Sequence, residues 1–64
     1  MMCTIYRACD DTKYLFQASS PYNAMKKMLY TLNLSRFDAK AKIKEINRGY
    51  ELTHCNEEFW TRRA

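Results

Sequence analysis

The sequence predicts a small α+β domain in which one amphipathic helix packs on a mostly antiparallel sheet. Apolar residues recur at helical spacing over residues 20–33, and they alternate with polar residues in the segments before and after that stretch. The chain has 64 residues, which is enough for only one small core. We therefore expect a single domain over residues 1–64, with its elements in the order β-β-α-β-β-β.

The composition narrows the class of protein. Hydrophobic residues make up 47% of the chain, which excludes a disordered chain on compositional grounds. No apolar run approaches the roughly 18 residues of a membrane span, so we expect no membrane partner. The first residues, MMCTIYRACDD, lack the basic and apolar segments of a secretory signal, which favours a cytoplasmic location. In that compartment Cys3, Cys9 and Cys55 stay reduced.

Two strands are expected ahead of the helix, over residues 3–9 and 14–18. The polar residues 10–13 between them predict a turn, and the resulting hairpin pairs Ile5 with Ala18. The side chains expected under the helix are those of Ile5, Phe16 and Ala18. The side chains expected on the other face are those of Tyr6 and Leu15.

The helix over residues 20–33 has recognisable ends. Ser20 can cap the free amides of the first turn, and Pro21 stands where its missing N–H has no cost. Asn33 is a residue that often ends a helix in the left-handed conformation. The apolar stripe consists of Met25, Met28, Leu29 and Leu32, with Tyr22 at its edge. The opposite side carries Asn23, Lys26, Lys27 and Tyr30.

The segment after the helix has two interpretations. Residues 35–38 have the form of a capping box, which predicts a short helical turn. Residues 39–47 are mostly good helix formers, but alanine and isoleucine also alternate there with lysine. We favour a strand, because Gly49 then marks a hairpin into the next strand.

A final turn over residues 55–58 leads to a short last strand through Phe59 and Trp60. The resulting element order places one helix across one face of the sheet. A β-grasp-like arrangement is the most economical version of that order.

The net charge of +4 comes from the middle of the chain. Residues 26–48 contribute +5, whereas residues 1–25 sum to zero and residues 49–64 to −1. The basic residues of this region that line or flank the expected strand are Arg36, Lys40, Lys42, Lys44 and Arg48. Such a stripe can neutralise phosphates, and it can also be a solvated edge that prevents strands of two molecules from pairing.

Aromatic residues are more numerous than one small core needs. With a helix on one face, Tyr6 and one of Phe59 or Trp60 are expected on the other, where rings can stack on bases. The same surface suits a protein partner or a second copy, since Tyr, Trp and Arg dominate interface hot spots. The candidate binding residues are Arg36, Lys40, Lys42, Lys44, Arg48, Tyr6 and Trp60. Nucleic acid and a protein partner are not separable from these residues.

We expect neither catalysis nor a cofactor. The sequence has no Gly-rich phosphate loop, and no nucleophile motif accompanies His54, the only histidine. A metal site built on Cys9, His54 and Cys55 is a remote alternative, because no CxxC spacing supports it. The sequence thus predicts a small non-catalytic module that binds a macromolecule, nucleic acid or a nucleic-acid-processing complex. The alternative is a small protein-directed inhibitor or adaptor of the kind found in mobile elements.

Overall fold

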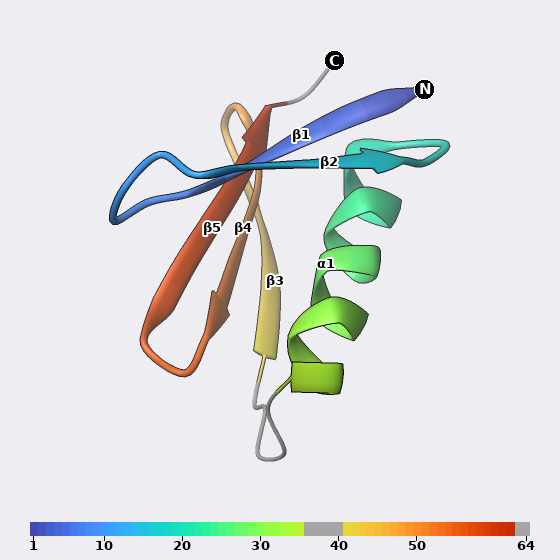
Figure 1. Cartoon of the computed structure of the whole chain (residues 1–64). Coiled ribbons are helices and arrows are strands. Elements are labelled where there is room, and N and C mark those ends of the chain that lie inside the picture. Colours follow the sequence, from blue (N-terminus) through green and yellow to red (C-terminus); the bar gives the residue numbers. More distant parts are fainter. Residues whose placement is uncertain (36–40, 63–64) are drawn as a thin grey trace.

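The computed structural model describes residues 1–35 and 41–62, and these residues confirm the expected order of five strands and one helix (Figure 1). The elements are β1 (Met2–Arg7), β2 (Lys13–Gln17), α1 (Pro21–Ser35), β3 (Ala41–Ile46), β4 (Gly49–His54) and β5 (Glu57–Arg62). The five strands form one sheet in the order β2-β1-β5-β4-β3, and every neighbouring pair is antiparallel. The helix packs across one face, as predicted.

The helix also explains how the chain crosses the sheet. Strands β2 and β3 are the two edges of the sheet, and α1 lies between them in the sequence. The chain therefore leaves one edge, passes over one face as a helix and returns at the opposite edge. Figure 1 shows the helix along one face of the sheet. Its apolar side chains cover that face.

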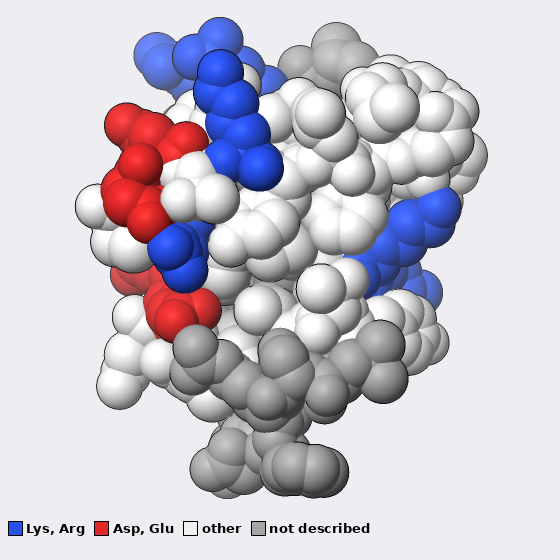
Figure 2. All heavy atoms as spheres, in the orientation of Figure 1, with Lys and Arg blue, Asp and Glu red and all other residues white. Residues whose placement is uncertain are grey.

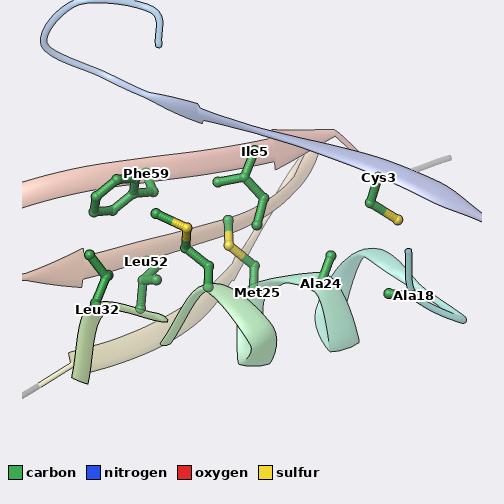
Figure 3. Close-up of a cluster of buried hydrophobic side chains, with 9 residues drawn as sticks. Cys3, Ile5, Ala18, Ala24, Met25, Leu32, Leu52 and Phe59 are labelled. Atoms are coloured by element: carbon green, nitrogen blue, oxygen red, sulfur yellow. The ribbon is translucent and has the colours of Figure 1, made fainter. Parts of the chain in front are cut away.

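The core lies between α1 and the covered face (Figure 3). Met25, Met28 and Leu52 are almost completely buried there, together with Ile5 and Phe59. Full burial of such a side chain stabilises the fold by about 1.5–3 kcal/mol relative to exposure. The remaining buried apolar residues are Cys3, Ala18, Ala24 and Leu32.

The helix begins as predicted but ends later. The backbone N–H of Asn23 donates to Ser20 Oγ at 3.2 Å, which satisfies one of the free amides of the first turn. The helix continues through Ser35, so the prediction that it ends at Asn33 is wrong by two residues. Asparagine tolerates the left-handed conformation without requiring it, and leucine at position 34 favours continuation. The predicted helical turn at residues 36–38 lies outside the described residues.

The register of the first hairpin differs from the prediction. Ile5 lies opposite Tyr14, four residues away from the expected partner Ala18. The reason is that the turn lies two residues earlier in the chain, because the amide of Arg7 donates to the carbonyl of Thr12 at 2.9 Å. Within this turn the carboxylate of Asp10 accepts bonds from the amide and hydroxyl of Thr12 at 3.0 and 2.7 Å. A shift by an even number of residues keeps every side chain on its face, so the faces predicted for this hairpin are confirmed.

The sequence allowed either a strand or a helix over residues 39–47, in the second half of the sheet. Residues Ala41–Ile46 pair with β4 along their whole length, which confirms the strand interpretation for this segment. The last turn is tighter than predicted, because Cys55 and Asn56 both adopt positive φ, at 49° and 65°. Strand β5 therefore starts at Glu57 and reaches Arg62, which makes it longer than the short strand expected.

His54 is the unusual member of the covered face. Its ring is fully buried, and neither ring nitrogen has a hydrogen-bond partner among the described residues. A buried polar group without a partner costs about 1–3 kcal/mol. The position therefore reduces the stability of an already small core.

A matched pair of helix substitutions tests the assignment of the buried face. Met28 is 1% exposed and Tyr30 is 67% exposed, and both stand in the middle of α1. We expect Met28→Ala to lower the free energy of unfolding by about 2–4 kcal/mol. Tyr30→Ala should change it by less than about 0.5 kcal/mol. Similar losses in urea unfolding would mean that the helix face is assigned incorrectly.

A second substitution tests the cost of the buried histidine. His54→Leu replaces two unpartnered nitrogens by apolar atoms of similar volume, so the free energy of unfolding should rise by about 1 kcal/mol. Thermal and urea unfolding measure this difference. A loss of stability on this change would show that the ring has partners that the core depends on.

Candidate functional site

The face of the sheet away from α1 carries a row of side chains in register across all five strands. Lys13 on β2 lies opposite Tyr6 on β1, and Tyr6 lies opposite Trp60 on β5. Trp60 lies opposite Glu51 on β4, and Glu51 lies opposite Lys44 on β3. At about 4.8 Å between neighbouring strands, the row is roughly 19 Å long. We call this surface the open face.

Two aromatic rings occupy the centre of the row. The rings of Tyr6 and Trp60 are stacked, with centroids 4.5 Å apart and an angle of 19° between their planes. Both side chains are half-buried, although no helix covers them. A stacked cross-strand pair of this kind contributes about 0.5–1.5 kcal/mol beyond the area that it buries. The two rings therefore shield each other where the fold gives them no other cover.

A cation stands beside each ring of the pair. Lys13 Nζ is 6.0 Å from the centroid of Tyr6, and Arg62 Cζ is 5.7 Å from the centroid of Trp60. Because each ring covers one face of the other, the cations lie over the outer faces. The order of contacts is cation, ring, ring, cation.

Two of the predicted basic residues join this surface. Lys42 and Lys44 alternate with core-facing residues on β3, and Lys42 lies opposite Thr53 while Lys44 lies opposite Glu51. Both lysines are exposed. The alternation that predicted the strand thus also places both ammonium groups on the open face.

The structure brings together four of the seven predicted binding residues, namely Tyr6, Lys42, Lys44 and Trp60. Arg48 is exposed in the turn between β3 and β4, next to Gly49, which pairs with Arg62. Arg48 therefore lies at one end of the open face. Arg36 and Lys40 lie outside the described residues.

The sequence prediction missed Lys13, Glu51 and Arg62. The prediction placed Lys13 in the turn over residues 10–13, away from Tyr6. Arg62 falls beyond a last strand that was expected to be short. The tight turn signalled by Asn56 is the feature that could have extended that strand to Arg62.

Exposed apolar side chains border the aromatic pair. Met2 and Leu15 are 63% and 66% exposed, and both belong to the open face of the β1–β2 hairpin. A hollow of about 240 Å³ lies near this corner, and its lining includes Met2, Thr4 and Arg62. Exposed apolar side chains of the β1–β2 hairpin therefore lie beside the rings, next to the row.

Four acidic residues lie together at one end of the sheet. Asp10 and Asp11 lie in the turn after β1, and Glu57 and Glu58 begin β5 at the same end of the sheet, where the amide of Ala8 donates to the carbonyl of Glu58. Figure 2 shows acidic side chains together at the left of the view and most basic side chains at its top and right.

One arginine is neutralised within the acidic end. Arg7 Nη2 lies 2.5 Å from Asp10 Oδ2, and its hydrogen bonds hold the pKa of that carboxyl well below its usual range. The same hydrogen bond raises the pKa of Arg7. Both groups stay charged at neutral pH and cancel each other. Arg7 therefore adds nothing to the positive charge of the open face.

The remote metal alternative finds its residues dispersed. His54 points into the core, whereas Cys9 and Cys55 are exposed in two different turns. Among the described residues, no group of three or more His, Cys, Asp or Glu side chains is placed to hold a metal ion.

No family model, curated protein or solved structure matches this chain. Within residues 1–35 and 41–62, no helix has the length and apolar character needed to cross a membrane.

Proposed function

We propose that this protein is a small non-catalytic module that binds single-stranded nucleic acid on the open face of its sheet. The observation that carries the proposal is the stacked pair of Tyr6 and Trp60 with a cation over each outer ring face. Bases stack on aromatic rings without regard to sequence, and lysine and arginine neutralise the phosphates that connect them. The three free cysteines support a cytoplasmic location.

On each ring, a stacked base is energetically more favourable than the cation that it would replace. An exposed cation–π contact contributes about 0.5–1 kcal/mol, whereas a stacked base contributes about 1–3 kcal/mol. A base that displaces Lys13 from Tyr6 therefore gains free energy and releases the ammonium group. The released ammonium can then contact the phosphate next to that base. Arg62 and Trp60 offer the same exchange at the other end of the pair.

The charges of the open face suit a single strand. Lys13, Lys42, Lys44 and Arg62 stand on this face, and within the described residues none of them forms an ion pair. Stacking requires bases that are free of a complementary strand, which excludes duplex nucleic acid as the preferred form. The protein therefore meets its ligand as an unpaired strand, loop or end.

A protein partner is the second candidate, and the exposed Met2 and Leu15 are the observation that favours it. Apolar side chains beside Tyr, Trp and Arg are typical of interface hot spots. An inhibitor or adaptor would use this corner of the open face, and a homodimer would bury it against its own copy. The experiment below separates these outcomes.

The first test is a salt titration with a matched pair of charge reversals. A labelled 8-nucleotide single strand of mixed sequence should bind with an affinity that falls linearly on a log–log salt plot, by about 0.7 per phosphate contact. Lys42→Glu should weaken binding and reduce the slope by about one contact. Lys26→Glu makes the same change in net charge on the helix, so it should leave the slope unchanged.

Two results would contradict the proposal. Equal effects of Lys42→Glu and Lys26→Glu would mean that net charge alone attracts the strand. No binding of any single strand at 50 mM salt, together with a concentration-dependent dimer or a captured protein lost on Trp60→Leu, would favour the protein-directed alternative.

The second readout uses the only tryptophan of the chain, which stands in the proposed site. A base stacked on Trp60 should quench its fluorescence in proportion to binding. Trp60→Leu should weaken binding by about 1–3 kcal/mol, measured by anisotropy of a labelled strand. An unfolding curve of the variant serves as the control for the fold. Unchanged affinity in a folded variant would show that no base stacks on Trp60.

A further inference from the structure

Glu51 is the acidic residue in the middle of the row. It lies opposite Trp60 on one side and opposite Lys44 on the other, and it is half-buried. Within the described residues its carboxylate makes no hydrogen bond or ion pair, not even with Lys44. An unpaired carboxylate at this place repels phosphates. It can favour binding only where a base next to it donates hydrogen bonds.

The spacing of the sheet places a base directly above this carboxylate. The rings of Tyr6 and Trp60 are 4.5 Å apart, close to the distance of about 4.8 Å between strands. A base stacked on Trp60 would extend this stack over β4, with its edge toward Glu51.

The four bases differ in what they offer a carboxylate. An ionised carboxylate only accepts hydrogen bonds, and it accepts two parallel ones best. Guanine alone has two adjacent donors on its Watson–Crick edge, the N1–H and the N2 amino group. Adenine and cytosine have one donor group beside an acceptor, and thymine and uracil have one donor between two carbonyl oxygens.

We propose that Glu51 makes the open face selective for guanine in a single strand, by accepting hydrogen bonds from N1–H and the N2 amino group. Lys44, opposite Glu51, is placed to donate to the O6 atom of the same base. The inference rests on the proposed function, because it requires a base stacked beyond Trp60. It adds that this base is read by its edge, whereas Tyr6 and Trp60 accept any base.

The experiment compares single strands that differ at one position. The probes are 8-nucleotide thymine strands with guanine, adenine, cytosine or inosine at a central position, together with the all-thymine strand. We expect the guanine strand to bind at least about fivefold more tightly than the adenine, cytosine and thymine strands. Inosine lacks the N2 amino group, so its strand should have intermediate affinity.

Two variants with the same change of charge assign the preference to one residue. Glu51→Gln should reduce the guanine preference to less than about twofold and raise the affinity for the all-thymine strand, because a like charge near the phosphates is removed. Glu58→Gln is the control. Glu58 is on the same face and two residues from Trp60 along β5, but it lies opposite Thr53 and not between Trp60 and Lys44, so this variant should keep the guanine preference.

The outcomes separate the two proposals. Tight binding of all five strands with equal affinity, or a guanine preference that survives Glu51→Gln, overturns the role of Glu51 and leaves the binding function in place. No binding of any strand to the wild-type protein at low salt overturns the proposed function, and the role of Glu51 with it.

Discussion

The structure depends on one constraint, which is that a single helix covers a single face of a five-stranded sheet. Helix α1 connects the two edge strands β2 and β3, so it crosses the sheet once and buries one set of alternating side chains. Every strand also has a second set, for which the described chain supplies no cover. On the covered face this produces the core around Ile5, Leu52 and Phe59. On the open face it produces the stacked pair of Tyr6 and Trp60, in which each ring is the other's cover.

The distribution of charge follows the same division. Arg7 and Asp10 form an ion pair at the acidic end of the sheet, where their charges cancel. Lys13 and Arg62 on the open face instead contact aromatic rings, and such contacts are weak enough to be exchanged. The two rings are already stacked, and the cations are easily displaced from them. The surface therefore needs little rearrangement to bind a single strand.

Periodicity in the sequence predicted the faces better than the register. The alternation of lysine with alanine and isoleucine identified β3 and placed Lys42 on the open face, because the side of a strand depends only on odd or even spacing. The register of β1 against β2 depends on the position of the turn, where Asp10 makes hydrogen bonds that periodicity does not contain. The row that joins Lys13 to Lys44 could therefore not be predicted, although Tyr6, Lys44 and Trp60 were. The burial of His54 without a partner has no signal in the sequence either.

The central claim is that the open face, and not the helix, meets the ligand. An NMR titration of the ¹⁵N-labelled protein with an unlabelled 8-nucleotide single strand tests it most directly. The account predicts that the amides of Tyr6, Trp60 and Lys44 and the indole N–H of Trp60 shift together, with the ring-current changes that a stacked base produces. Shift changes confined to α1 or to the acidic turns, with the Trp60 indole unmoved, would contradict it.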